Sequence, residues 1–211
     1  MDKSPNDSGW RGSADVWLDA ACDLLLESGV DAVKILPLAQ KLNLSRTSFY
    51  WFFKDRSELL AALLAQWREK NTGNLIKLAN AYADSLVEAV LNVSDAWFDS
   101  SLFDSRFEFA VRSWALQSPE VLAEVQAADQ QRLEALRALY LRFGYSEMAA
   151  DVRARTMYLV QIGYISMQTK EDLTLRLSRL PQYVEVFANT VPQKHEMDRF
   201  MARHRPREEG T

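Results

Sequence analysis

The sequence predicts an all-α protein in which an N-terminal three-helix domain precedes a larger helical domain. Apolar residues make up 48% of the chain, and in most segments they recur three or four positions apart, which is the spacing of an amphipathic helix. Glycine and proline are scarce, with 7 and 6 residues, whereas β-sheet proteins use both at their turns. Periodicity and composition therefore favour helices joined by short loops.

Composition also excludes several functional classes. No apolar run approaches the roughly 18 residues of a membrane-spanning helix, and the polar N-terminus lacks the apolar stretch of a signal peptide, so we expect a cytoplasmic protein without membrane contact. The single Cys22 is typical of a reducing compartment. The only histidines, His195 and His204, lie in a polar segment, which leaves little material for a metal site or a catalytic triad. We expect no metal, no cofactor and no enzymatic activity.

The N-terminal segment carries clear helix signals. Apolar spacing predicts helices at residues 13–28, 35–42, 46–53 and 57–71. Asn43 tolerates the left-handed conformation of a tight turn, and Ser45 is a good N-cap for the third helix. Asp55 and Glu58 have the spacing of a capping box at the start of the fourth helix.

The remaining residues predict further helices. Their predicted ranges are 74–92, 95–117, 119–143, 146–168 and 171–190, the last with a break at Pro181. The predicted organisation is a disordered N-terminus at 1–12, a helix-turn-helix domain at 13–56 with a connecting helix at 57–71, a helical effector-binding and dimerisation domain at 72–191, and a flexible basic tail at 192–211.

The second and third helices have the form of a helix-turn-helix, in which the second helix of the pair lies in the major groove of DNA. Arg46 could bond guanine, and the Thr47 methyl could meet a thymine methyl. Four side chains are placed to contact phosphates: Ser48, Tyr50, Lys54 and Arg56. Trp51 lies on the outer face of the helix, and Lys34 could contact the opposite wall of the groove. The predicted DNA-binding residues are Lys34, Arg46, Thr47, Ser48, Tyr50, Trp51, Lys54 and Arg56.

The distribution of charge agrees with this hypothesis better than the net charge does. The formal net charge is −4, but residues 34–56 hold Lys34, Lys41, Arg46, Lys54 and Arg56 against one acid, Asp55. The first helix carries an acidic stripe of Asp15, Asp19, Asp23 and Glu27, which we interpret as a solvated face.

The order of residues from 29 to 64 closely resembles the DNA-binding domain of the TetR (tetracycline repressor) family. The resemblance is carried by Ile35-x-x-Leu38-Ala39, Leu44-Ser45-x-x-Ser48-Phe49-Tyr50-Trp51-x-Phe53-Lys54-Asp55-Arg56 and Glu58-Leu59-Leu60. It is dense over about the first 65 residues and weak in the helical remainder. Three residues depart from the family pattern: Lys34 at a common Ser or Thr cap, Asn43 at a common turn Gly, and Thr47 at a position that is often Gly.

The resemblance implies that Arg46, Thr47 and Tyr50 contact bases or nearby backbone, and that Ser48, Tyr50 and Arg56 contact phosphates. It also implies a homodimer on palindromic, double-stranded operator DNA, with helices 146–168 and 171–190 as interface candidates. A small-molecule effector, bound among the C-terminal helices, would release the operator. Repression, and not activation, is an expectation from the resemblance alone.

For the effector pocket we predict an aromatic cavity with a few polar groups. The predicted lining is Trp97, Phe98, Phe103, Phe107, Trp114, Tyr158 and Gln161. Arg106 and Arg112 are possible anchors for an acidic ligand. Core packing is an alternative explanation for each of these aromatic residues.

Two other functional classes compete with a DNA-binding regulator. An enzyme is disfavoured because the sequence shows no nucleophile–base pair, no metal-ligand spacing and no Gly-rich phosphate loop. A helical adaptor that kept the fold but no longer binds DNA stays open, because the first domain as a whole is slightly acidic.

Overall fold

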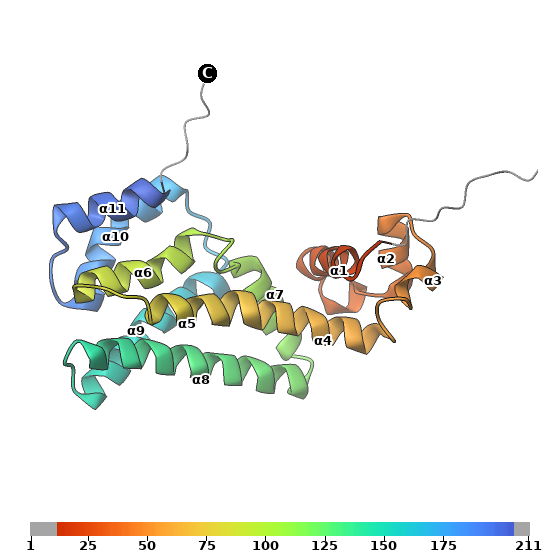
Figure 1. The fold of residues 1–211 in the computed structure, drawn as a ribbon, viewed down its shortest axis with the longest axis horizontal. Coiled ribbons are helices and arrows are strands. Elements are labelled where there is room, and N and C mark those ends of the chain that lie inside the picture. Colours follow the sequence, from red (N-terminus) through yellow and green to blue (C-terminus); the bar gives the residue numbers. More distant parts are fainter. Residues whose placement is uncertain (1–11, 205–211) are drawn as a thin grey trace, which may run out of the picture. The chain divides into compact units, whose positions relative to one another are not determined.

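The computed structural model describes residues 12–204, and every regular element in this part of the chain is a helix (Figure 1). The predicted all-α fold is confirmed. None of the described helices combines the length and apolarity needed to span a bilayer. The chain divides into two compact units, residues 1–66 and 67–211. The disorder predicted for residues 1–11 concerns residues outside the described range.

The N-terminal unit is built around a small aromatic core. Its elements are α1 (Ala14–Ser28), a 3₁₀ turn (Val30–Ala32), α2 (Ile35–Leu42), α3 (Arg46–Phe49) and α4 (Arg56–Trp67), the last of which reaches the boundary between the units. Trp17 of α1 and Phe49 of α3 are fully buried, with their rings edge to face at 5.4 Å. Phe53 packs against Phe49 at 5.5 Å. Such aromatic pairs add about 0.5–1.5 kcal/mol beyond their buried area.

Local signals in the sequence set the ends of these helices. Ser13 caps α1 by accepting from the backbone N–H of Val16. Asp55 accepts from the N–H of Glu58 at 3.0 Å, as the predicted capping spacing requires. The third helix is shorter than predicted, because α3 ends at Phe49 and Tyr50 opens a turn.

The C-terminal unit is a bundle in which α8 packs along α9, and α6 is contacted by α5, α10 and α11 (Figure 1). Its elements are a π-helical segment (Arg68–Gly73), α5 (Asn74–Ala79), α6 (Leu86–Phe98), α7 (Ser105–Ala115), α8 (Pro119–Arg142), α9 (Glu147–Ser166), α10 (Leu173–Ala188) and α11 (Lys194–His204). Ser118 and Ser146 cap α8 and α9 as the sequence predicts.

The predicted helices at 74–92 and 95–117 are wrong. The chain instead breaks at residues 80–85 and again at 99–104. Ser85 caps α6 by accepting from the N–H of Glu88, and Asp104 caps α7 by accepting from the N–H of Arg106 and of Phe107. Both capping residues lie inside long apolar-periodic stretches, which hid these helix starts.

The C-terminal end also differs from the prediction. Pro181 lies inside α10 without ending it. Residues 194–204, predicted to be part of a flexible tail, form α11, and Phe200 is fully buried there. The ring of Phe200 packs edge to face on Phe98 at 5.4 Å. The three apolar residues that fix this helix, Met197, Phe200 and Met201, have helical spacing that was outweighed by the polar composition around them.

A buried ion pair lies at the centre of the C-terminal unit. Arg132 of α8 and Glu108 of α7 are both fully buried, with their charged atoms 2.7 Å apart. Glu108 also accepts from the indole N–H of Trp67 at 2.7 Å and from the amide of Asn71 at 2.9 Å. Arg132 donates to the Thr72 hydroxyl at 2.9 Å. The end of α4 and the π-helical segment are thereby bonded to the ion pair that joins α7 and α8.

The network shifts the titration of its members. Burial alone would raise the pKa of Glu108, but the charges of Arg132 and Arg112 and the hydrogen bonds that Glu108 accepts outweigh it, so the pKa lies below its ordinary value. Tyr158 of α9 donates to Asp129 at 2.6 Å. Burial raises the pKa of the Tyr158 phenol, so it stays protonated and able to donate.

We expect Arg132→Met to lower the free energy of unfolding by about 3–5 kcal/mol, because it leaves the Glu108 carboxylate buried without its main partner. Urea denaturation measures the change. Arg199→Met is the matched control, since Arg199 pairs with Glu88 at the surface and is 57% exposed, where a pair contributes about 0–1 kcal/mol. Equal effects of the two variants would contradict the central role of the ion pair.

The lowered pKa of Glu108 predicts a pH dependence. A carboxyl group whose folded pKa lies below its unfolded value, about 4.3 for Glu, stabilises the fold above that value and loses this contribution as the pH falls through the folded pKa. The stability gap between the parent and Glu108→Gln should therefore shrink as the pH is lowered from neutrality through this acid range. Urea denaturation at a series of pH values measures the gap, and a gap that stays constant would refute the assignment.

Candidate nucleic-acid interface and pocket

The turn between α2 and α3 has the backbone conformation that the sequence predicts. Asn43 is in the left-handed region at φ 53° and ψ 41°, and it ends α2. The N–H of Leu44 then donates back to the carbonyl of Ala39 at 2.9 Å. Ser45 caps α3 by accepting from the N–H of Ser48 at 3.2 Å. These local bonds fix how α3 leaves the turn.

The short α3 and the turn after it present one buried and one exposed side. Phe49 is fully buried against Trp17. The opposite side is exposed, with Tyr50 at 53% and Trp51 at 64%. This exposed side consists of Arg46, Thr47, Tyr50 and Trp51. The predicted base-contacting residues are therefore gathered on one accessible surface.

Two of the predicted DNA-binding residues lie differently. Ser48 is 7% exposed, and its hydroxyl lies 2.9 Å from that of Ser45. Arg56, half-buried, donates to the backbone carbonyls of Val33 and Val30, the latter at 2.7 Å. The structure thus uses Ser48 within the turn, and Arg56 to tie α4 to the segment before α2. Neither side chain reaches the exposed side of α3.

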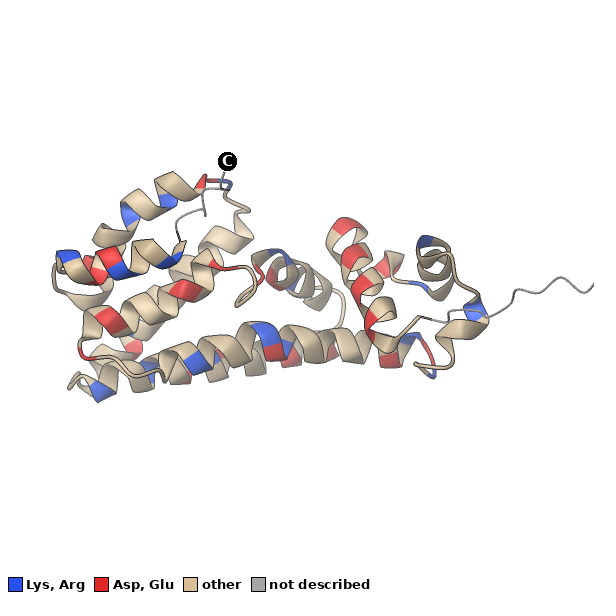
Figure 2. Cartoon of the chain, turned by 45° about the horizontal axis from the view of Figure 1, so that its top comes forward, with Lys and Arg blue, Asp and Glu red and all other residues tan. Residues whose placement is uncertain are grey.

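Basic residues and acidic residues are segregated in this unit. Lys34 and Lys54 are exposed, as is Arg46, whereas Lys41 forms ion pairs with Asp23 at 3.2 Å and Glu27 at 3.6 Å. Figure 2 shows the acidic residues in red along α1. The stripe on α1 therefore neutralises Lys41 and leaves the three other cations for a partner.

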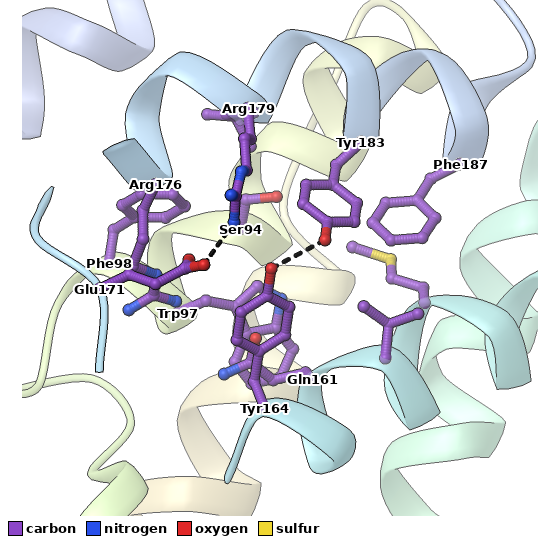
Figure 3. Close-up of a pocket in the computed structure, with 13 residues that line it drawn as sticks. Ser94, Trp97, Phe98, Gln161, Tyr164, Glu171, Arg176, Arg179, Tyr183 and Phe187 are labelled. Atoms are coloured by element: carbon purple, nitrogen blue, oxygen red, sulfur yellow. Dashed lines mark hydrogen bonds and ion pairs between the residues drawn. The ribbon is translucent and has the colours of Figure 1, made fainter. Parts of the chain in front are cut away.

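A narrow pocket lies in the C-terminal unit between α6, α9 and α10 (Figure 3). Its cavity volume is about 50 Å³. Trp97, Phe98 and Gln161 line it, as the sequence predicts. The other lining residues are Ser94, Met157, Val160, Tyr164, Glu171, Arg176, Arg179, Leu180, Tyr183 and Phe187.

The four other predicted pocket residues do not line this cavity. Phe103, Phe107 and Trp114 are buried in the packing of the unit, and Tyr158 belongs to the ion-pair network. Phe103 adjoins the network, because the guanidinium carbon of Arg132 lies 5.4 Å from its ring centre.

The two arginines considered as ligand anchors lie outside the pocket as well. Arg112 pairs with Glu108 at 2.9 Å and also with Asp129, within the network. Arg106 is exposed.

The polar half of the pocket was missed in the sequence. Arg176, Arg179, Tyr183 and Phe187 recur at helical spacing on α10, and this face was a usable signal. The predicted break at Pro181 obscured it. The hydroxyls of Tyr183 and Tyr164 lie 2.8 Å apart, and this hydrogen bond raises the pKa of Tyr183.

A second, shallow apolar groove runs between α9 and α10. Met148 and Val152 of α9 are 73% and 54% exposed, and Val186 of α10 is 62% exposed. The groove has a volume of about 510 Å³. Its full lining is Ser146, Met148, Ala149, Val152, Arg153, Thr156, Val186 and Phe187.

Solved structures with a similar fold include two bacterial proteins. Salmonella enterica GusR aligns over 89% of this chain and 100% of its own, with a TM-score of 0.62 and 12% identity. The fatty acid degradation regulator FadR from Bacillus halodurans aligns over 89% of this chain and 97% of its own, with a TM-score of 0.61 and 15% identity. At these identities the likeness concerns the fold.

The curated relatives match a short stretch. The tetracycline repressor protein class D of Escherichia coli is 41% identical over 49 residues, which is 23% of this chain and 22% of the repressor. The class H repressor of Photobacterium damsela subsp. piscicida gives the same values. Residues 18–63, which contain α2, α3 and the turn between them, match the family model described as bacterial regulatory proteins, tetR family. This similarity to the tetR family covers the helix-turn-helix and lies within the N-terminal unit.

Proposed function

We propose that the protein is a sequence-specific DNA-binding regulator that acts as a homodimer, and a repressor that a small molecule releases from its operator. One observation carries the DNA-binding part: α3 buries Phe49 while Arg46, Thr47, Tyr50 and Trp51 stay exposed. Core packing alone does not require exposed aromatic rings beside an arginine on the second helix of a helix-turn-helix.

The exposed residues fall into two chemical roles. Arg46, in the first turn of α3, can donate two hydrogen bonds to guanine, and Thr47 can meet a thymine methyl group. Lys34, Tyr50 and Lys54 are suited to phosphates, which position the protein without reading sequence. Ser48 bonds within the turn, and Arg56 ties α4 to the segment before α2, so we leave both out of this contact set.

The apolar groove of α9 and α10 supports a homodimer. Met148, Val152 and Leu159 recur along one face of α9 and are more than half exposed, at 73%, 54% and 57%. An exposed apolar patch of this kind marks a protein interface. A two-fold dimer would place two recognition helices about 34–36 Å apart on a palindromic operator.

The pocket supports control by a small molecule. It combines aromatic walls with a few polar groups, the usual composition of a ligand site. The curated relatives are named as repressors, which favours repression over activation for this chain. An effector that binds the DNA-free state more tightly than the DNA-bound state would shift the population away from the operator.

A helical adaptor without DNA binding is the second candidate, favoured by the acidic face of α1. Selection of genomic DNA by the purified protein at moderate salt separates the two functions. A short palindrome with half-sites about one helical turn apart supports the regulator. The absence of any enriched sequence after the bound small molecules are removed by denaturation and refolding supports the adaptor.

We expect Arg46→Ala to weaken operator binding by about 1–3 kcal/mol and to relax specificity at one base position. Lys54→Ala should weaken binding to all DNA and reduce the salt slope by about one. Fluorescence anisotropy with operator and unrelated duplexes measures both effects. Arg199→Ala removes the same charge from α11, and this variant should bind DNA as tightly as the parent does. An equal loss of affinity in Arg199→Ala would mean that the effect comes from net charge alone.

We expect Val152→Lys to convert a dimer into a monomer, because an ammonium group would be buried without a partner in an apolar interface. Light scattering after gel filtration measures the mass. Leu116→Lys is the control, since Leu116 is 86% exposed on the turn after α7 and outside the groove. If the Val152→Lys variant keeps its dimeric mass, α9 is not part of the dimer interface.

A further inference from the structure

The pocket carries an excess positive charge. Two arginines, Arg176 and Arg179, line it together with a single carboxylate, that of Glu171. All three come from α10 and the residues just before it (Figure 3). The lining therefore has one guanidinium charge that no lining carboxylate balances, and such a charge is stabilised by an anion.

The two arginines differ in what they contact. Arg179 forms an ion pair with Oε1 of Glu171 and is 47% exposed. Arg176 lies over the ring of Phe98, with its guanidinium carbon 5.0 Å from the ring centre. Among residues 12–204, no carboxylate lies within ion-pair distance of Arg176. Arg176 is thus held by stacking, and its N–H groups face no fixed anion.

Glu171 offers a second polar contact. Its Oε2 atom is buried and has no hydrogen-bond partner in the described part of the chain. A buried acceptor without a partner is destabilising. A hydroxyl or amide N–H on a ligand would satisfy it, so the polar end of the pocket can take both an anionic group and a neighbouring donor.

The rest of the lining is apolar. Trp97, Phe98 and Phe187 supply aromatic rings, and Met157 and Leu180 add aliphatic surface. A volume of about 50 Å³ is small for an organic molecule. Entry therefore requires side chains to move. The hydroxyl pair of Tyr164 and Tyr183 joins α9 to α10 across the pocket and is the contact that a ligand would displace (Figure 3).

We propose that the pocket binds an organic carboxylate with an apolar or aromatic body, whose carboxylate pairs with Arg176 and whose body lies against Trp97 and Phe98. The alternative ligand, an amine held by Glu171, would have to enter beside two guanidinium groups, one of them without a counter-ion. The role of this ligand as an effector rests on the proposed function, whereas the binding itself does not.

Isothermal titration calorimetry of the full chain tests the choice of ligand. Cinnamate, cinnamyl alcohol and cinnamylamine place three head groups on one flat body, and octanoate, octanol and octylamine place them on a linear body. In at least one series the carboxylate should bind about tenfold or more tightly than its alcohol and its amine, because a hydrogen bond to a charged group contributes that much. If no carboxylate is preferred in either series the proposal is wrong, and a preferred amine would assign the pocket to cations.

Variants locate the interaction. Arg176→Gln should weaken binding of the preferred carboxylate about tenfold or more and leave the matched alcohol unchanged. Glu171→Gln should keep or strengthen carboxylate binding, since it removes the negative charge beside the ligand. Arg199→Gln, on the exposed side of α11, is the control. If Arg199→Gln weakens carboxylate binding as much as Arg176→Gln, or if Glu171→Gln abolishes it, the assigned contacts are wrong. Circular dichroism confirms that each variant is folded.

The same protein separates this inference from the proposed function. Operator binding without a preference for carboxylates overturns the ligand class and leaves the regulator in place. A preference for carboxylates in a protein that selects no DNA sequence overturns the regulator and leaves the ligand class in place.

Discussion

The arrangement of the C-terminal unit depends on the buried pair of Glu108 and Arg132. Two charges without solvent are costly unless nearly all their hydrogen-bonding groups are used, and here Trp67, Asn71 and Thr72 take up the remaining positions. These three partners come from one stretch, the end of α4 and the π-helical segment, so satisfying one ion pair fixes this stretch against α7 and α8. The apolar core supplies most of the stabilisation, but its contacts are non-directional and do not specify this register.

The N-terminal unit is held together by packed aromatic rings. A helix as short as α3 is not stable alone, and its only deep anchor is Phe49 against Trp17. Because Phe49 makes the deep packing contact of α3, the neighbouring positions are not needed for packing. Arg46, Thr47 and Tyr50 can therefore be exposed at no cost to the fold, which is the condition for a surface that reads DNA. The ion pairs of Lys41 join α2 to the acidic face of α1 without occupying that surface.

The parts of this structure that are determined locally could be predicted from the sequence, and the parts that depend on distant contacts could not. The bounds of α2, the left-handed Asn43 and the Ser45 cap follow from a few neighbouring residues. The break before Ser85 and the start of α11 do not, because Ser85 is also held by Glu196, far along the chain, through a hydrogen bond of 2.6 Å. The candidate pocket shows the same division. Aromatic composition pointed to Trp97 and Phe98, whereas the burial of Phe103 beside Arg132 involves a residue far along the chain.

Helix α9 connects the pocket to the ion-pair network. Gln161 and Tyr164 face the pocket, and Tyr158, one turn earlier, bonds Asp129 and Arg132 in the network. A ligand can shift a conformational equilibrium only by binding its two states with different affinity, and a pocket of about 50 Å³ must change shape to bind at all. Under the proposed function, a ligand that displaces Gln161 would act about one helical turn from Tyr158, because an α-helix has 3.6 residues per turn. The same network holds Asn71 and Thr72, the first buried polar residues after α4.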